Sequence, residues 1–302
     1  MIFNLLGEQP TISNFLMDIC IFVLILIFAP IIGGLLSGID RVFTARLQGR
    51  QGPPLLQPFY DFIKLLGKES KLSSKMQLVW IGAYLFLTAF SLVFIFMRQD
   101  ILVVVFLMGF AGICLVMSGF SVKSPYSHMG ANRELLQILA YEPILILTAI
   151  GIYLHNGSFM LSDIFNGNNQ PMLISMWPIF LALVIILTIK FRKSPFDLST
   201  SHHAHQEVVK GVTTEISGEY YAVFLLAEWY EAVLLLTIVS LFWAAPIWIG
   251  IVIALAVFLL EMVIDNISAR LTASWMIKYS WIITLVLCLT NIIYLFVKRG
   301  AL

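Results

Sequence analysis

Long apolar segments separated by shorter polar ones run through the whole chain. An α-helix needs roughly 20 apolar residues to cross the hydrocarbon core of a bilayer. The pattern predicts eight membrane-spanning helices, at about residues 14–36, 77–97, 101–121, 134–154, 173–191, 216–242, 246–265 and 275–297. The apolar runs are continuous and do not alternate in short units, which excludes a transmembrane β-barrel. We therefore expect an all-α polytopic membrane protein whose residues 1–302 form a single membrane domain.

A shorter pattern follows the first predicted span. Leu55, Phe59, Phe62 and Leu66 recur at helical spacing, and charged residues occupy the other faces. This pattern predicts an amphipathic helix at about residues 54–68 that lies in the membrane interface. The same helix could pack against another subunit, and the two interpretations are compatible.

The placement of lysine and arginine predicts the orientation of the chain. One set of loops carries 15 of the 18 basic residues, and the other set carries only Arg98, Lys298 and Arg299. Basic residues accumulate in loops on the cytoplasmic side, so the first set is expected to be cytoplasmic. Both termini then face outward, in agreement with an even number of spans.

Composition supports a membrane protein without chemistry of its own. Apolar residues make up 60% of the chain and charged residues 12%, and the net charge of +1 gives no reason to expect a nucleic-acid partner. The three cysteines lack CxxC spacing and are expected to be inert. No removable signal peptide is expected. Because no nucleophile, phosphate-binding, dinucleotide or metalloprotease motif occurs, we expect no catalytic, cofactor-binding or metal-ligating residues.

Acidic residues inside the apolar segments are the candidates for function. Glu134 and Glu142 share a face of the fourth predicted span, and Pro143 next to Glu142 frees a backbone carbonyl. An acidic side chain well inside a span costs on the order of 2–3 kcal/mol on insertion scales, so it is by default a functional hypothesis. Glu134, close to the end of its span, could instead reach water.

A second acidic cluster follows the fifth predicted span. Glu215 and Glu219 are four residues apart, so they are expected to share a helix face and one proton. The complete candidate ion or proton path comprises Glu134, Glu142, Asp197, Glu207, Glu215, Glu219 and Glu228. At the end of the seventh predicted span, Glu261 is expected to be ion-paired or to reach the interface.

Three histidines, His202, His203 and His205, lie within four residues of the loop after the fifth span. Neighbouring histidines cannot face one helical site together, so docking or proton exchange is favoured over a metal. The basic loops also favour a docked partner. The predicted docking residues are Arg41, Arg46, Arg50, Lys64, His202, His203 and His205.

Several long motifs resemble one family. These are Asp40-Arg41, the run from Arg50 to Glu69, Ala140-Tyr141-Glu142, the run Ser194-Pro-Phe-Asp-Leu198, and the segment from Glu215 through Leu226-Ala-Glu-Trp229. Together they resemble the subunit 1 family of respiratory complex I, the H subunit of bacterial enzymes, and the resemblance covers essentially the whole chain. It implies a membrane subunit of a bacterial or archaeal respiratory complex, located in the cytoplasmic membrane.

Two departures from that family select a branch. The Gly52-Pro53-Pro54-Leu55 run is contracted, and the histidine-rich segment replaces a proline and acidic run. These features resemble the membrane-bound, energy-converting nickel–iron hydrogenases of the Ech and formate hydrogenlyase types. The resemblance implies an anchor and coupling subunit that links ferredoxin-type electron transfer and proton reduction to H⁺ or Na⁺ movement.

The implied partners are peripheral hydrogenase large and small subunits, an iron–sulfur subunit, an antiporter-like membrane subunit and the lipid bilayer. The nickel–iron centre and iron–sulfur clusters are expected on those partner subunits. Two alternatives are a quinone-site subunit of a complex I-like NADH/quinone oxidoreductase and a related sulfur-reducing complex. A standalone carrier or a purely structural anchor is a further possibility.

Overall fold

The computed structural model describes residues 12–71, 73–166, 171–196 and 210–300 of the 302-residue chain. Its regular elements within these ranges are all helical. They are α1 (Ile12–Leu47), α2 (Gln57–Leu66), α3 (Lys75–Phe96), α4 (Ile101–Phe120), α5 (Pro125–Asn156), α6 (Leu161–Asn166), α7 (Met172–Ser175), α8 (Trp177–Lys190), the 3₁₀ turn η2 (Gly211–Thr213), α9 (Glu219–Leu241), α10 (Ile247–Ile267), α11 (Ala273–Ile283), the π-helical segment η3 (Thr284–Leu289) and α12 (Thr290–Gly300). The prediction of an all-α chain is confirmed.

Seven helical segments are long and apolar enough to cross a membrane, counted over the described ranges. They are α1, α3, α4, α5, α9, α10 and the continuous segment from α11 to α12. The segment predicted at 173–191 differs, because it is divided at Met176 into α7 and the 14-residue helix α8. At 1.5 Å per residue, α8 extends over about 21 Å, less than a hydrocarbon core of about 30 Å.

Two helices, α1 and α5, are longer than the spans predicted for them. α1 continues to Leu47, so Arg41 and Arg46 lie on a helix and not in a loop. α5 begins at Pro125, well before residue 134. Both helices extend beyond their apolar segments into stretches where only one face is buried. Hydropathy alone marks where a helix is apolar, and it does not mark where the helix ends.

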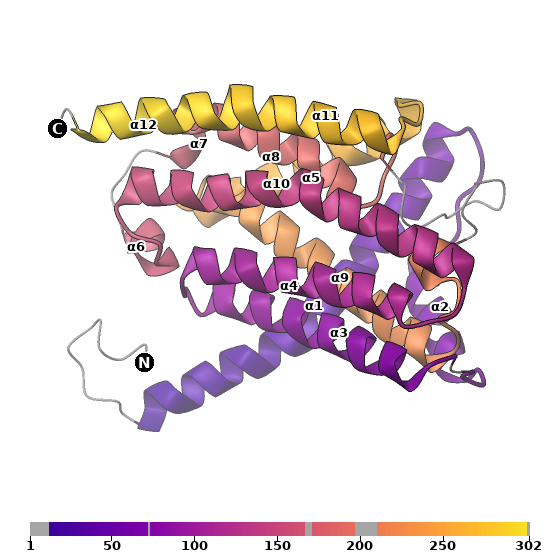
Figure 1. Ribbon diagram of the computed structural model, residues 1–302. Coiled ribbons are helices and arrows are strands. Elements are labelled where there is room, and N and C mark those ends of the chain that lie inside the picture. Colours follow the sequence, from indigo (N-terminus) through magenta and orange to yellow (C-terminus); the bar gives the residue numbers. More distant parts are fainter. Residues whose placement is uncertain (1–11, 72, 167–170, 197–209, 301–302) are drawn as a thin grey trace.

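The helices lie side by side in a bundle, in which α3 packs on α4 and α9, and α5 packs on α4, α8 and the α11–α12 segment. α1 begins and α12 ends at one end of the bundle, and α2 lies at the opposite end (Figure 1). Close contact between α1 and α9 requires a glycine. A Cβ added to Gly33 would collide with the carbonyl oxygen of Trp229.

The outward faces of the bundle are apolar. Phe86, Trp248 and Phe296 are 64%, 66% and 68% exposed, and many other large apolar side chains on the spanning helices are also exposed. Water-soluble monomers rarely expose continuous apolar surface of this kind. The exposed faces fit lipid contact, as expected of a multi-pass membrane protein.

Candidate functional site

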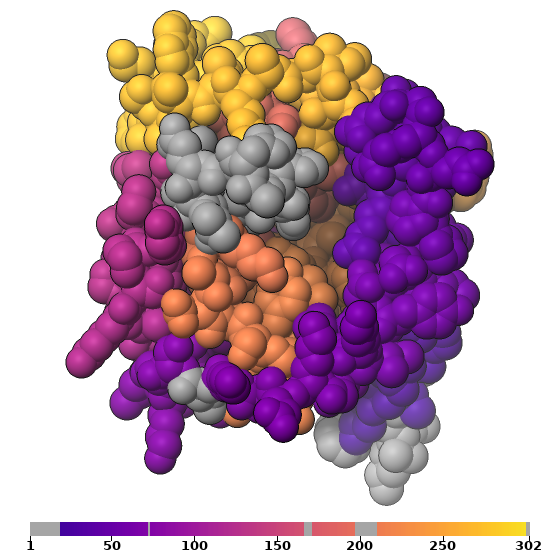
Figure 2. Space-filling view, turned by 90° about the vertical axis from the view of Figure 1, so that its right-hand side faces the viewer, coloured from indigo at the N-terminus to yellow at the C-terminus, as the bar shows by residue number. Residues whose placement is uncertain are grey.

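A cavity of about 500 Å³ lies where α1 and α10 end, α9 begins and the chain leaves α8. Figure 2 shows this end of the molecule, hollowed between the indigo segment of α1 and α2 and the orange segment that leads into α9. Aromatic and apolar side chains form part of the lining. The charged lining residues are Arg41, Arg50, Lys190, Arg192, Lys193, Arg270, Asp40, Glu228, Glu231 and Asp265.

The backbone at the end of α8 delivers three basic side chains to this cavity. The N–H of Arg192 donates to the carbonyl of Ile189, and the N–H of Lys193 donates to the carbonyl of Thr188, both at 3.0 Å. These two bonds form a Schellman cap, which commonly has glycine at the left-handed position. Here Arg192 occupies that position with φ of 53°. A left-handed conformation costs a residue other than glycine roughly 1–2 kcal/mol. Arg98, at the end of α3, has the same conformation and the same pair of backbone bonds.

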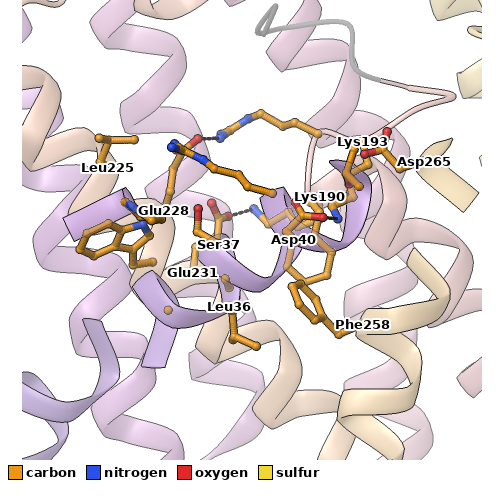
Figure 3. Close-up of a pocket in the computed structure, with 18 of the residues that line it drawn as sticks. Leu36, Ser37, Asp40, Lys190, Lys193, Leu225, Glu228, Glu231, Phe258 and Asp265 are labelled. Carbon is orange, nitrogen blue, oxygen red and sulfur yellow. Dashed lines mark hydrogen bonds and ion pairs between the residues drawn. The ribbon is translucent and has the colours of Figure 1, made fainter. Parts of the chain in front are cut away.

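The first network surrounds Lys190, the last residue of α8. Its Nζ lies 2.6 Å from Oε1 of Glu231 on α9 (Figure 3). It also donates to the hydroxyl of Tyr141 on α5 at 3.0 Å. The hydroxyl of Tyr84 on α3 donates to the other oxygen of Glu231, also at 2.6 Å. Both side chains of the ion pair are less than one-tenth exposed. A buried pair is tolerated only when further hydrogen bonds complete it, as the two tyrosines do here.

The second network surrounds Arg192. Its guanidinium lies 2.6 Å from Oε1 of Glu228 on α9 and 3.3 Å from Oε1 of Glu134 on α5. Glu134 is buried and Glu228 is partly exposed to the cavity. One cation therefore holds two carboxylates from different helices at the base of the cavity. The alternative in which Glu134 simply reaches water does not hold, because the side chain is buried and ion-paired.

The third network ties the segment after α8 to α1 and α10. Lys193 Nζ lies 2.8 Å from Oδ1 of Asp40, which belongs to α1. The backbone N–H of Ser194 donates to Oδ1 of Asp265 on α10 at 2.9 Å. The segment that carries Lys190, Arg192 and Lys193 is thus held in place from both sides. The prediction of the chain's orientation counted Lys190, Arg192 and Lys193 as basic residues of loops, whereas the structure buries all three.

Glu142 lies beyond the first network, further along α5. A Cβ added to Gly109 of α4 would lie 2.5 Å from Oε1 of Glu142, so this glycine provides the space for the carboxylate. Oε2 of Glu142 is buried and has no hydrogen-bond partner among the described residues. Tyr141, the preceding residue, accepts a hydrogen bond from Lys190. Glu142 therefore directly follows, along α5, a member of the Lys190 network.

The structure separates Glu215 from Glu219, which were predicted to share a helix face and a proton. Glu219 is the first residue of α9 and is exposed, whereas Glu215 precedes the helix. Between them Gly218 takes φ of 58°, which breaks the helical path. Oε2 of Glu215 accepts a hydrogen bond from Ser73 at 3.0 Å. The prediction of a shared helix face was wrong, because the helix begins four residues later than Glu215.

Five of the predicted site residues lie outside the described ranges. They are Asp197, Glu207, His202, His203 and His205. Of the seven predicted path residues, Glu134 and Glu228 share the guanidinium of Arg192, and Glu228 also lines the cavity. Glu142 lies further along α5, beside Gly109 of α4.

The predicted basic docking residues lie at the same end of the bundle as the cavity. Arg41 and Arg50 line the cavity, and Arg46 and Lys64 are exposed. Arg41 also pairs with Asp61 of α2 at 2.6 Å. Burial acts to raise the pKa of Asp61, but hydrogen bonds from Arg41 and Gln57 and the charges of Arg41 and Lys64 lower it below its ordinary value.

The amphipathic helix is confirmed as α2. Its rings of Phe59 and Phe62 pack against Trp229 of α9, with centroids 5.4 and 5.5 Å apart. Tyr60 and Ile63 are 56% and 65% exposed. The helix therefore packs on α9 with one face and presents other apolar side chains outward, as expected of a helix at a membrane or subunit interface.

Sequence reasoning missed several members of the networks. Lys190, Arg192, Lys193, Glu231, Tyr84, Tyr141 and Asp40 were not among the predicted path residues, although one of them, Arg192, connects two acids that were, Glu134 and Glu228. One signal was available. Three basic residues at the end of an apolar helix favour counter-charges nearby, and the described acids that pair with them lie on neighbouring helices.

The arrangement can store and pass charge. Carboxylates, a lysine and phenol hydroxyls within hydrogen-bond distance of one another, inside an apolar bundle, are typical of ion and proton pathways. Among the described residues, no three His, Cys, Asp or Glu side chains come close enough together to hold a metal ion. The chemistry that these residues support is the transfer of protons or the binding of cations.

Comparison with known proteins places the chain among respiratory membrane subunits. The model of the family described as NADH dehydrogenase matches residues 19–296. The NADH-quinone oxidoreductase subunits H of Carboxydothermus hydrogenoformans and Bacillus cereus are each 28% identical; the alignments cover 84% of this chain and 81% of the first, and 97% of this chain and 97% of the second. The corresponding protein of Dehalococcoides mccartyi is 26% identical, over 93% of this chain and 87% of its own.

A solved structure shares the fold. A chain of the membrane-bound sulfane sulfur reductase, an archaeal respiratory membrane complex, superposes with a TM-score of 0.84. The match covers 92% of this chain and 99% of that chain, at 23% sequence identity. At this identity the likeness establishes the helical architecture, and it leaves the electron acceptor open.

Proposed function

The chain belongs to the NADH dehydrogenase family, as a membrane subunit of a complex I-like oxidoreductase, and on that premise we propose that it couples electron transfer in a docked redox module to ion movement across the membrane. The observation that carries the proposal is the pair of buried ion networks beside the cavity. Lys190 and Arg192 connect carboxylates of α5 and α9 at the end of the bundle that bears the basic residues.

The networks would transmit charge in two directions from the cavity. Glu228 faces the cavity and contacts Arg192, so a charge that appears on a docked partner changes its electrostatic environment first. Lys190 and Tyr141 lie between Glu231 and Glu142. A change in charge at one member alters the proton or cation affinity of the next, because interactions at these short distances are strong in an apolar surrounding. The ion moved would be H⁺ or Na⁺.

The topology that we propose has eight crossings and both termini on the outer side. Seven segments have the required length, and α7 with α8 would form the eighth crossing together. The cavity, α2 and the basic residues would then face the cytoplasm, in keeping with the charge count. Arg41, Arg46, Arg50 and Lys64, with His202, His203 and His205, would form the surface on which the peripheral subunits dock.

The electron acceptor is a separate part of the proposal. The relatives named above are quinone oxidoreductase subunits and a sulfur reductase, so a quinone or sulfur compound is favoured over the proton reduction of a hydrogenase. The hydrogenase hypothesis rests on the contracted Gly52-Pro53-Pro54-Leu55 run and on the histidine-rich segment. Iron–sulfur clusters, and nickel–iron in the hydrogenase case, would belong to partner subunits. Purified complex assayed with a quinone, with polysulfide and for hydrogen evolution separates the three branches.

The test of coupling is ion transport per electron in proteoliposomes that contain the whole complex. Glu142→Gln keeps the size of the side chain and removes its charge. We expect fewer ions transported per electron than in the unmodified complex. Asp163→Asn, an exposed acid on α6, is the matched control and should leave the ratio unchanged. An unchanged ratio in Glu142→Gln would show that Glu142 is not on the path.

A further inference from the structure

Glu261 of α10 is an acid that the networks described above do not use. The residue is fully buried, and neither carboxylate oxygen has a hydrogen-bond partner among the described residues. Buried polar atoms are nearly always satisfied, and an unsatisfied charged group is more costly than a neutral one. The expectation that Glu261 is ion-paired or reaches the interface is therefore wrong. A buried carboxyl without a partner requires an account of its own.

Its position places it beside the cavity. Phe258 and Asp265, three residues before and four residues after it on α10, both line the cavity. Residues three and four apart lie on one face of a helix. The charged groups that act on Glu261 are Lys193, which follows α8, and Asp265 on its own helix. Neither oxygen is hydrogen-bonded to a group on the described parts of α1 or α9.

Lys193 lies between two elements. Its Nζ is 2.8 Å from Oδ1 of Asp40 on α1 and 5.3 Å from the ring centroid of Phe258 on α10 (Figure 3). The ammonium group therefore lies over the ring of Phe258, whose position on α10 is three residues before Glu261. Among the described residues, Asp40 is its ion-pair partner.

We propose that Glu261 is a proton-binding site, and that the presence of this proton determines whether Lys193 stays paired with Asp40. With the proton bound, the carboxyl is neutral and Lys193 remains on Asp40. When the O–H bond breaks and the proton passes to water in the cavity, Glu261 becomes an anion. It then competes for Lys193, and the link between α1 and the segment after α8 weakens. The part of this inference that concerns ion movement rests on the proposed function, whereas the proton-binding site does not.

The consequence would reach the docking side of the molecule. Asp40 is followed by Arg41, which lines the cavity and pairs with Asp61 of α2. A proton at Glu261 would thus be linked to how firmly the end of α1 is held against the segment that carries Lys190 and Arg192. This assigns α10 a role that neither the carboxylate path nor the family motifs gave it.

Infrared spectroscopy of the whole complex in lipid nanodiscs, titrated with acid and base without an electron donor, tests the site. The C=O stretch of a protonated carboxyl is resolved from that of a carboxylate. At neutral pH we expect Glu261→Gln to lose one such band and Glu261→Asp to retain a shifted one. Asp61→Asn should leave the bands at that pH unchanged, because the lowered pKa of Asp61 keeps its carboxyl ionised there. Retention of every band in Glu261→Gln would overturn the proposal.

Two further variants test the competition for Lys193. Asp40→Asn frees Lys193 for Glu261, so the protonated fraction at a given pH should fall. Lys193→Met removes the cation for which Asp40 and Glu261 compete, so the protonated fraction of Glu261 should rise. No change in either variant would overturn the pairing exchange. These titrations involve no turnover, so their result does not depend on ion transport. The shifts can be observed even if Glu142→Gln shows no loss of transport. Failure of the proton-site proposal is therefore distinguishable from failure of the proposed function.

Discussion

The buried pair between Lys190 and Glu231 allows a quantitative prediction. Replacing Lys190 by methionine keeps most of the side-chain volume and removes the charge. Glu231 then retains only the hydrogen bond from Tyr84, in a site where its side chain is 8% exposed. The substitution leaves an acid buried without its cation, and this is the most costly way to alter such a pair.

The size of the effect follows from the distance and burial. Two unit charges at the observed separation of 2.6 Å attract by about 6 kcal/mol at an effective dielectric constant of about 20. Desolvation of both groups offsets much of this attraction, so the net contribution of the pair is small. Removal of one partner alone is expected to cost about 3–5 kcal/mol. Replacement of both should cost much less than the sum of the two single changes.

A double-mutant cycle measures this difference. The variants are Lys190→Met, Glu231→Gln and the double variant, and the measurement is the free energy of unfolding of the purified complex in detergent. The coupling energy should be at least about 2 kcal/mol, with the double variant more stable than either single one. Thr237→Val, at a partly buried hydroxyl that donates to the carbonyl of Val233, serves as an unrelated control. Additive single effects would refute the ion-pair reasoning.

Three other changes test separate parts of the site. Gly109→Ala should cost less than about 1 kcal/mol, because the carboxylate of Glu142 can move away, yet it should lower the ions transported per electron in proteoliposomes. Arg192→Gly relieves the left-handed backbone but leaves two carboxylates without their cation, so thermal denaturation should show net destabilisation of about 3–5 kcal/mol. Because the folded-state pKa of Asp61 is lowered, its contribution to stability is present above the unfolded-state value and lost as pH falls through the folded-state value. The attachment of α2, followed by hydrogen exchange, should therefore persist at neutral pH and weaken only in acid.

Apolar length predicted most of the fold. Every predicted span corresponds to helical structure, because lipid leaves no other partner for the backbone of a spanning segment. The amphipathic helix was predictable for a related reason, since its apolar positions recur at helical spacing. The ends of the helices were harder to predict, as the continuation of α1 to Leu47 shows. The start of α9 depends on the backbone of Gly218, which spacing between glutamates does not reveal.

The acidic residues of the site could be predicted from the sequence, whereas the basic residues that pair with them could not. Glu134, Glu142 and Glu228 stood out because a carboxylate in an apolar segment is costly. Their partners did not stand out, because a lysine or arginine at the end of a helix resembles an ordinary loop cation. The left-handed turn at Arg192 directs that side chain inward, and this is a property of tertiary structure. Glu261 was misjudged for the same reason, since its burial depends on the packing of α10.

The central claim is that the acids around the cavity carry the coupling. The most direct measurement is the number of ions transported per electron by the reconstituted complex with Glu228→Gln, because Glu228 both faces the cavity and contacts Arg192. The account predicts a ratio clearly below that of the unmodified complex and of Asp163→Asn. A ratio equal to theirs would contradict it.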